Sequence, residues 1–271
     1  MLMTVSITDA EFALFQQFIF DQAGITLPSS KKSLVSGRLA KRLRLHQLER
    51  YSDYLALLRQ PAHAHELQVA VDLLTTNETY FFREQKHFDF LRQRALAARG
   101  RAAMFRVWSA ASSSGEEAYS VAMVLADCLG EHTPWEVLGT DISTRVLRGA
   151  QRAQYPMARA RDIPPAYLRR FCLRGTQEYE GTLLVDRSLR QHVHFRQVNL
   201  NQPLPTLGQF DVVFLRNVMI YFSDETKRHV VARVVSALRP GGHLLIGHAE
   251  TLNDITDAVQ PVMPSVYHKP V

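Results

Sequence analysis

The segment FRVWSAASSSGEEAYS, residues 105–120, decides the fold of this chain. An apolar run over residues 105–111 leads into a loop of small residues with a single glycine, Gly115, and then into an apolar helical pattern over residues 116–129. A short buried strand that turns through such a loop into a helix is typical of a parallel sheet covered by helices. These residues therefore predict the first strand and the first helix of an α/β domain.

The same alternation continues along the rest of the chain. Further strands are predicted at 136–140, 193–198, 210–215 and 243–247, with helices through Val146 and Leu147 and from 224 to 238. Strands that alternate with helices imply a mostly parallel sheet with both faces covered. Residues 161–192 interrupt this pattern with a short helix at 167–171 and then TQEYEGTLLVD, residues 176–186. We expect the latter to form a strand, a turn at Gly181 and a second strand, which gives an inserted antiparallel β-subdomain.

Residues 1–75 contain helical patterns alone, so we predict a small all-α domain there. Thr8 and Glu11 have the spacing of a capping box, which places the start of a helix at this point. Residues 76–103 are expected to form a linker helix preceded by a ligand-contacting segment, and residues 104–271 the α/β domain. The predicted fold class is α/β with a small helical domain in front.

Composition limits the classes of protein that fit. The 271 residues are 46% hydrophobic and 21% charged, which is typical of a soluble globular protein, and no apolar stretch approaches the roughly 18 residues of a membrane span. We therefore expect a cytoplasmic protein. Its two cysteines, Cys128 and Cys172, are expected to be free thiols. The close histidine pairs have no third ligand nearby in sequence, and His248 is interpreted as structural, so no metal site is predicted.

Residues 1–75 carry a net charge of only +1 and the rest of the chain +5, so no domain is broadly basic, but the basic residues of the first part are clustered. Between residues 31 and 50 seven lysines and arginines face only one acidic residue, Glu49. Apolar residues recur there every four positions, so a helix would bury them and project basic side chains from its other side. Such a face is either ordinary solvated surface or a site for an acidic partner. The residues expected on it are Arg38, Lys41, Arg42 and Arg44.

Ligands of open α/β sheets bind at the carboxyl ends of the strands, where this chain is unusually polar. A dinucleotide-binding loop needs three glycines, and the first loop has only Gly115, so pyrophosphate binding is not expected. Glu117 in the same loop suits a cationic ammonium or sulfonium group, or else forms a capping box with Ser114. Asp141 follows the second strand, 26 residues after Gly115, where an acidic residue commonly accepts both ribose hydroxyls; its alternative role is a helix N-cap.

Other polar residues follow the later strands. Asn199 and Leu200 end one strand, and Arg216 and Asn217 end the next, with Tyr221 a turn further on. An asparagine and a backbone amide could read the adenine edge, while Leu200 and Val218 enclose its ring. The segment LTTNETYFFRE, residues 74–84, adds three polar side chains for a small zwitterion: Asn77, Thr79 and Arg83. A positively charged nucleoside without phosphates points to S-adenosylmethionine.

These motifs together resemble the CheR family of chemotaxis receptor glutamate O-methyltransferases over nearly the whole chain. The likeness is carried by TTNETYFFRE, VWSAASSSGEEAYS, LGTDIS, VNL, FLRNVMIYF and GHAETL. It implies a class I S-adenosylmethionine-dependent methyltransferase fold, preceded by a helical domain and carrying an inserted β-subdomain. The family often has Cys-Ser-Thr-Gly where this chain has Ser112 to Gly115, and GHSE where this chain has GHAE; neither change removes an expected ligand.

The resemblance also implies roles for individual residues. Arg83 and Tyr221 would lie near the transferred methyl group, and the basic helix would contact the methylation helices of membrane chemoreceptors. Some family members dock a receptor's C-terminal pentapeptide on the inserted hairpin, and nothing in residues 173–192 decides whether this chain does so. The residues expected to bind S-adenosylmethionine are Asn77, Thr79, Arg83, Glu117, Asp141, Asn199, Leu200, Arg216 and Asn217.

The expected reaction is methyl transfer to receptor glutamates for chemosensory adaptation, with no nucleic acid as partner, no direct membrane insertion and a monomeric enzyme. Two alternatives remain open. One is a methyltransferase for nucleic acid or a small molecule, because the cofactor fold alone does not fix the acceptor. The other is a regulatory module that binds S-adenosylmethionine without turnover.

Overall fold

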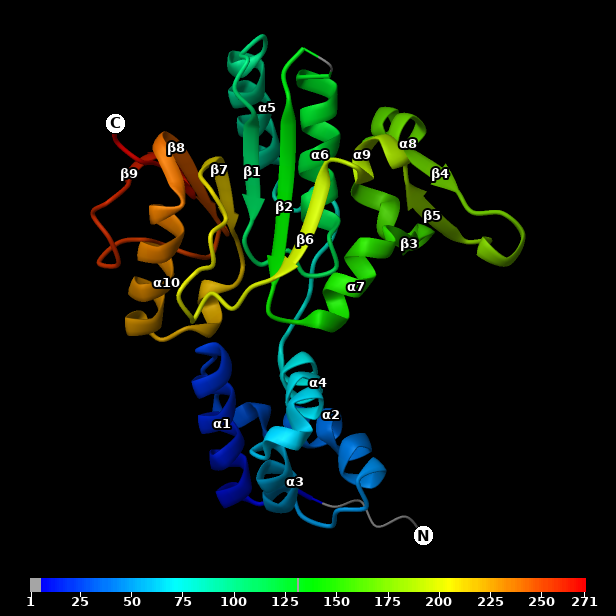
Figure 1. Cartoon of the computed structure of the whole chain (residues 1–271), viewed down its shortest axis with the longest axis vertical. Coiled ribbons are helices and arrows are strands. Elements are labelled where there is room, and N and C mark those ends of the chain that lie inside the picture. Colours follow the sequence, from blue (N-terminus) through cyan, green and yellow to red (C-terminus); the bar gives the residue numbers. More distant parts are fainter. Residues whose placement is uncertain (1–5, 131) are drawn as a thin grey trace.

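The structure, a computed structural model, describes residues 6–130 and 132–271. Figure 1 shows a small helical domain at one end, a larger α/β domain, and an arm of short strands at the side of the latter. The helical domain comprises α1 (Asp9–Ala23), α2 (Lys32–Leu45), α3 (Tyr51–Leu58) and α4 (Ala64–Leu74), with 3₁₀ turns at Ser29–Lys31 and Pro61–His63.

The helical domain has a hydrophobic core of its own. Val35, Leu39 and Leu43 are fully buried on one side of α2, as their spacing predicts. The capping box at the start of α1 is confirmed, because the Thr8 hydroxyl accepts from the Glu11 amide and the Glu11 carboxylate accepts from the Thr8 amide. The helical domain therefore has an apolar core that is separate from the core of the sheet.

The α/β domain is built on a seven-stranded sheet in the order β6-β2-β1-β7-β8-β10-β9. The first five strands of this order are parallel, whereas β10 is antiparallel to both of its neighbours. The strands are β1 (Phe105–Ser109), β2 (Trp135–Asp141), β6 (Val193–Gln197), β7 (Phe210–Leu215), β8 (Leu238–Ile246), β9 (Gln260–Met263) and β10 (Val266–His268). The predicted α/β class with a mostly parallel sheet is confirmed.

Helices cover both faces of this sheet. Successive residues of β1, Val107 and Trp108, belong to separate hydrophobic clusters on opposite faces, as expected for a strand buried on both sides. The first cluster packs against α5 and α6, and the second against α10. The helices of this domain are α5 (Gln85–Ala98), α6 (Glu116–Cys128), α7 (Thr144–Arg152) and α10 (Asp224–Ser236), with a 3₁₀ turn at Met219–Tyr221.

The arm is a three-stranded antiparallel sheet in the order β3-β5-β4. The expectation of a strand just before Gly181 is wrong, since Gln177–Tyr179 is a 3₁₀ turn. Residues 176–180 are all exposed, and Tyr179 is the only large apolar side chain among them, so they have no apolar face to bury and form a turn instead. The elements of the arm are β3 (Gln154–Pro156), a 3₁₀ turn (Met157–Asp162), α8 (Pro165–Phe171), β4 (Cys172–Arg174), β5 (Thr182–Val185) and α9 (Arg187–Arg190).

Two further predictions concern the cysteines and membrane-spanning helices. Cys128 and Cys172 are free thiols, and burial raises the pKa of both, that of Cys172 to about 11. No helix in the described part of the chain is long and apolar enough to cross a bilayer.

Candidate functional site

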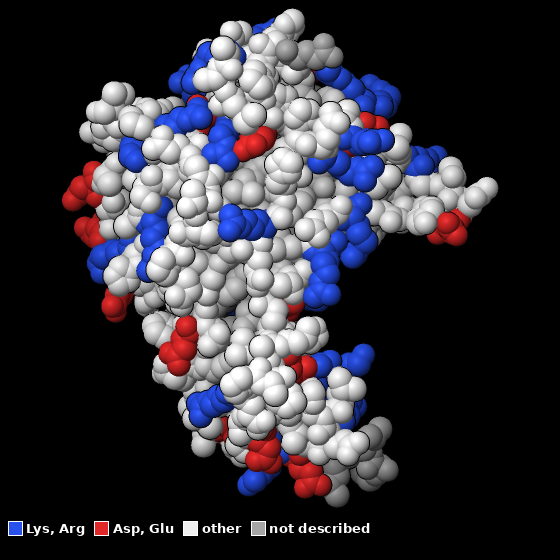
Figure 2. Space-filling view, viewed as in Figure 1, with Lys and Arg blue, Asp and Glu red and all other residues white. Residues whose placement is uncertain are grey.

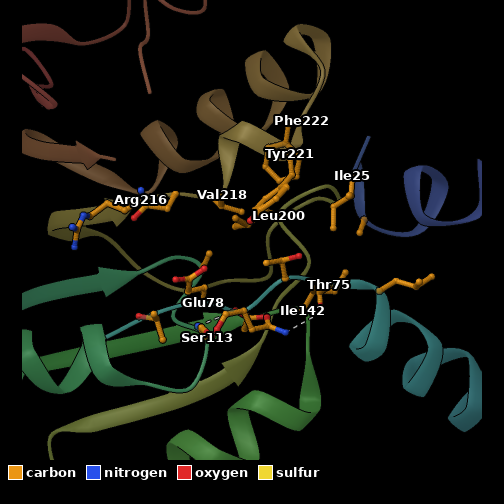
Figure 3. Close-up of a pocket in the computed structure, with 18 of the residues that line it drawn as sticks. Ile25, Thr75, Glu78, Ser113, Ile142, Leu200, Arg216, Val218, Tyr221 and Phe222 are labelled. Carbon is orange, nitrogen blue, oxygen red and sulfur yellow. Dashed lines mark hydrogen bonds between the residues drawn. The ribbon is translucent and has the colours of Figure 1, made fainter. Parts of the chain in front are cut away.

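A cavity of about 200 Å³ lies where the carboxyl ends of the central strands meet the helical domain. Figure 3 shows Leu200, Val218 and Tyr221 on one side of it and Ser113, Glu78 and Ile142 on the other. Every residue predicted to bind cofactor or to lie near the transferred methyl group lines this cavity: Asn77, Thr79, Arg83, Glu117, Asp141, Asn199, Leu200, Arg216, Asn217 and Tyr221.

Asp141 ends β2 and is buried in the cavity wall. One of its carboxylate oxygens accepts from the Ser113 amide and the other from the Ser143 amide, each at 2.9 Å. Ser143, not Asp141, occupies the N-cap position of α7. Burial raises the pKa of Asp141 to about 6, against the effect of these amides, so the group is ionised at neutral pH with capacity for further donors.

The loop after β1 is shaped by Gly115. Its φ is +95°, and a Cβ at this position would lie 2.8 Å from the Cβ of Ala150 and 2.9 Å from the Tyr155 hydroxyl. Both the conformation and the close approach therefore require glycine. Glu117 forms no capping box with Ser114; it accepts from the Ser109 hydroxyl at 2.7 Å. Its carboxylate thus faces the cavity rather than the helix end.

Arg216 lies between two carboxylates at the end of β7 and is almost completely buried. Its guanidinium is 2.8 Å from Glu117 Oε2 and 3.0 Å from Glu84 Oε2, and it also donates to the backbone carbonyl of Arg83. Burial opposes ionisation of Glu84, but Arg216 outweighs it and lowers the pKa of that carboxyl. Arg216 therefore orients neighbouring groups, and only its Nε has no partner.

Glu84 was missed by the sequence reasoning, although it lies within LTTNETYFFRE. It occupies the N-cap position before α5 with a φ of +62° and also approaches the buried ring of His87, whose Nδ1 is 3.4 Å from Glu84 Oε2. Burial and Arg216 lower the pKa of His87 to about 3, so the ring is neutral. Glu84, His87 and His248 place potential metal ligands within 4.8 Å of one another. Because Arg216 already neutralises this carboxylate, a metal cation would face the guanidinium directly.

Glu250, in the GHAETL segment, was also missed. Its carboxylate accepts from the amides of Asn217 at 2.9 Å, Met219 at 2.8 Å and Gly247 at 2.7 Å. Three backbone donors on one carboxylate hold the loop after β7 against the end of β8. An acidic residue in the loop after a strand can therefore hold backbone amides rather than a ligand, which the sequence pattern does not reveal.

The segment before α5 crosses the cavity as an extended strap. The Ser113 hydroxyl donates to the carbonyl of Asn77 at 2.8 Å, which joins this strap to the loop after β1. The Arg83 guanidinium donates to the carbonyl of Glu78 at 3.2 Å and lies 5.6 Å from the centre of the Tyr80 ring. Thr79 also lines the cavity. Arg83 is only partly buried, so its side chain stands at the mouth of the site.

Asn199 connects the domains instead of offering a free amide. Its side chain donates to the carbonyl of Gln22 at 2.7 Å and accepts from the Asn201 amide at 3.0 Å. The expected reading of adenine by this side chain is therefore not supported by its hydrogen bonds. Leu200 and Val218 lie on the same side of the cavity, where they present an apolar surface to a flat ring.

The helical domain supplies an apolar wall that sequence reasoning did not predict. Its backbone is tied to the segment after β7, since the Thr26 amide donates to the carbonyl of Tyr221 at 2.8 Å and Ile25 forms a bridge with Phe222. The wall is mostly apolar, with Thr26 and Lys31 as its polar members, and consists of Ala23, Ile25, Thr26, Leu27, Pro28, Lys31 and Leu34. Nothing in these residues distinguishes them from an ordinary domain surface, so their position becomes known only when the domains are docked.

The basic face of α2 divides into two pairs. Arg38 donates to the carbonyls of Leu73 and Thr75, at 3.1 and 3.0 Å, and so caps the end of α4. Arg42 forms an ion pair with the buried Glu66. Lys41 and Arg44 are exposed and have no ion pair within the described part of the chain. Of the four basic residues predicted for this face, only Lys41 and Arg44 are therefore free to bind a partner.

Known proteins similar to this chain agree with the geometry. Residues 77–267 match the family described as CheR methyltransferase, SAM binding domain, and residues 10–75 match CheR methyltransferase, all-alpha domain.

Three chemotaxis protein methyltransferases are similar to this chain over most of their length. The protein of Klebsiella aerogenes is 40% identical over 260 residues, which cover 94% of this chain and 88% of the relative. The protein of Escherichia coli is 41% identical over 253 residues, 93% and 87% of the two chains. Chemotaxis protein methyltransferase 2 of Pseudomonas aeruginosa is 40% identical over 263 residues, 96% and 93%. The chain therefore belongs to the CheR methyltransferase family and is an S-adenosylmethionine-dependent methyltransferase.

Proposed function

We propose that this protein transfers the methyl group of S-adenosylmethionine to glutamate side chains of chemoreceptors, giving glutamyl methyl esters and S-adenosylhomocysteine. The observation that carries the proposal is the charge arrangement of the cavity. Asp141 stands where ribose hydroxyls would donate, and Glu117 where a cationic amino acid group would bind. Arg216, which is buried in the cavity wall, is already held by Glu84 and Glu117.

The cofactor supplies an electrophilic methyl group on a sulfonium sulfur when bound. A glutamate acceptor has an unperturbed pKa near 4.3, so at neutral pH its carboxylate is already the nucleophile and no general base is needed. The protein's task is then to align the carboxylate oxygen with the methyl carbon and the sulfur. Such positioning can lower the barrier by roughly 7–11 kcal/mol.

Arg83 and Tyr221 are the residues we propose for holding the acceptor at the mouth of the cavity. Arg83 is only partly buried, and within the described part of the chain its side chain donates a single hydrogen bond, to the carbonyl of Glu78, so its remaining donors are available. A bidentate grip on the acceptor would reduce its nucleophilicity, and a looser contact fits better. If Tyr221→Phe and Arg83→Ala both kept full kcat at saturating substrates, this assignment would be wrong. Arg99→Ala, at the opposite end of the sheet, is the matched control for loss of one arginine.

The acceptor is tested with labelled S-adenosylmethionine and receptor-bearing membranes, followed by treatment with alkali. Glutamyl methyl esters release volatile methanol under these conditions, whereas methylated bases do not. Label that enters added nucleic acid and not receptor would favour the nucleic-acid alternative. Tight cofactor binding by titration without transfer to receptor, nucleic acid or small carboxylates would favour a regulatory binding module.

The proposal extends to the assembly. The protein would act as a monomer in the cytoplasm, and the arm β3-β5-β4 is the surface for a receptor C-terminal peptide if this receptor has one. Light scattering tests whether the protein is a monomer.

Titration with a synthetic C-terminal peptide of the cognate receptor tests whether the arm binds it. The Leu173 side chain is exposed on the arm, so an unchanged peptide affinity after Leu173→Ser would count against this surface.

A further inference from the structure

Two segments of the chain are basic and contain no acidic residue. Residues 31–48 hold six lysines and arginines, and residues 142–161 hold five arginines, in both cases without Asp or Glu. The first segment contains α2, whose basic face was predicted to meet an acidic partner. The second contains α7, which follows the cavity residue Asp141 and has no role in the proposed function so far.

The arginines of α7 form one exposed stripe. Arg145, Arg148 and Arg152 are spaced by three and four residues, which places them on one side of the helix, while its other side is buried. None of the three is in an ion pair among the residues that the structure describes. Arg148 donates only to Thr144 of its own helix, at 3.1 and 3.3 Å. The stripe therefore carries three charges that form no ion pair with any carboxylate in the described residues.

A buried aspartate fixes α7 to the helical domain. Asp72 of α4 accepts from the Thr144 amide at 2.9 Å, the Thr144 hydroxyl at 2.9 Å and the Arg145 amide at 3.1 Å. Helix α2 packs on the same α4, and Arg38 of α2 caps its end. The exposed cations of α2 and α7 are thus held at fixed positions relative to each other through α4.

Figure 2 shows a hollow between the two domains with Lys and Arg side chains on both of its sides. In Figure 1 the same side of the molecule carries α7 above and the end of α2 below. The exposed cations of these two helices that have no ion pair in the described residues are Lys41, Arg44, Arg145, Arg148 and Arg152.

We propose that these five residues form one docking surface, the two-domain basic surface, which binds the acidic face of the receptor's helical bundle. The inference rests on the proposed function, since a glutamate-bearing helix is then the substrate. Opposite charges on the two partners would hold the bundle across both domains beside the cavity mouth. Each methylation removes one negative charge from the bundle, which weakens the attraction and favours release of the product.

The test compares two double variants that lose the same charge. Arg148→Gln/Arg152→Gln removes two cations of the stripe, and Arg99→Gln/Arg101→Gln removes two exposed arginines at the opposite end of the sheet. With receptor membranes at low salt, the first variant should raise receptor KM about fivefold, with kcat and cofactor affinity unchanged. Its KM should also depend less on salt concentration than that of the wild type, because fewer charges are screened. The control should match the wild type.

The outcomes separate this inference from the proposed function. If the wild type methylates receptor and the α7 variant has an unchanged KM and salt dependence, the two-domain basic surface is wrong while the function stands. If the wild type does not methylate receptor at all, the function itself fails. A duplex DNA probe is included: loss of DNA binding in the α7 variant without a change in receptor KM would assign the stripe to nucleic acid and overturn the proposal.

Discussion

The cavity has two walls that differ in chemistry and in origin. The sheet and the first turn of α6 supply a polar wall, with Asp141 and Arg216 at the ends of strands and Glu117 at the start of the helix. The helical domain supplies an apolar wall, in which Ile25 and Leu34 are half-buried. The polar wall can select a ligand through charge and hydrogen bonds, whereas the apolar wall can exclude water and cover the ligand. The α/β domain therefore recognises the ligand and the helical domain encloses it. Substitutions on the two walls should differ in the size and in the kind of their effects.

The largest effect is expected at the centre of the polar wall. Arg216→Met leaves the carboxylates of Glu84 and Glu117 facing each other without their shared cation. Removal of one partner from a buried ion pair typically costs about 3–5 kcal/mol of unfolding free energy. Urea denaturation measures this loss, and Arg228→Met, an exposed arginine that bonds only the carbonyl of Asp254, should leave it near zero. Equal stability of the two variants would contradict the central role of Arg216.

A smaller effect, confined to the ligand, is expected for Asp141→Ala. Hydrogen bonds to a charged group are worth roughly 1.5–3 kcal/mol, so cofactor affinity should fall about 10- to 150-fold. Isothermal titration with S-adenosylhomocysteine measures the change. Asp186→Ala removes an N-cap carboxylate in the arm and serves as the control, with no change in affinity. A wild-type Kd in Asp141→Ala would show that the ribose does not bind there.

The pH dependence sharpens the assignment of Asp141. Its pKa is raised to about 6 by burial, and ligand hydroxyls donate to the ionised form, so affinity should fall as the pH drops below about 6. Proton release on binding near pH 6, seen by titration in buffers of different ionisation enthalpy, is the expected signature, and Asp141→Asn should lack it.

The same group also affects folding. Its pKa in the folded protein exceeds the unfolded value of 3.8, so the folded state is favoured below about pH 4 and loses this contribution as the pH rises through about 6. The free energy of unfolding of the ligand-free wild type and of Asp141→Asn, measured at pH 4 and pH 7, tests this pH dependence.

The smallest effect is expected on the apolar wall. Ile25→Ala or Leu34→Ala removes a few methyl groups of contact, worth about 1 kcal/mol, so ligand affinity should fall roughly fivefold without any pH dependence. Leu45→Ala, an exposed residue at the end of α2, is the control. A loss as large as that of Asp141→Ala would mean that the helical domain recognises the ligand and does not only cover it.

The difference between the walls also explains what sequence reasoning could predict. Parallel strands bring their carboxyl ends to one edge, so polar residues after each strand converge by a general rule, and Asp141 and Arg216 were found in this way. The wall from Ile25 to Leu34 depends on how two domains dock, and its residues look like any apolar surface. The capping box at Thr8 was predictable because it is local in sequence.

Side-chain roles were harder to predict than positions. Glu250 and Glu84 hold loops through backbone amides and Arg216, and no spacing rule distinguishes such acids from ligands. Helical periodicity predicts Arg38 and Arg42 on the basic side of α2. It does not show that Arg38 meets a backbone carbonyl and Arg42 a carboxylate of the neighbouring helix. The false strand before Gly181 arose because turn and strand residues alternate in that polar stretch.

The most direct test of the two-walled cavity is a crystal structure of the protein with S-adenosylhomocysteine. We predict both ribose hydroxyls within hydrogen-bond distance of the Asp141 carboxylate, the adenine against Leu200 and Val218, and the amino acid end beside Glu117. The apolar wall of the helical domain would cover the ligand from the other side. A ligand bound elsewhere, or bound in the cavity with Asp141 unengaged, would contradict the division of labour between the two domains.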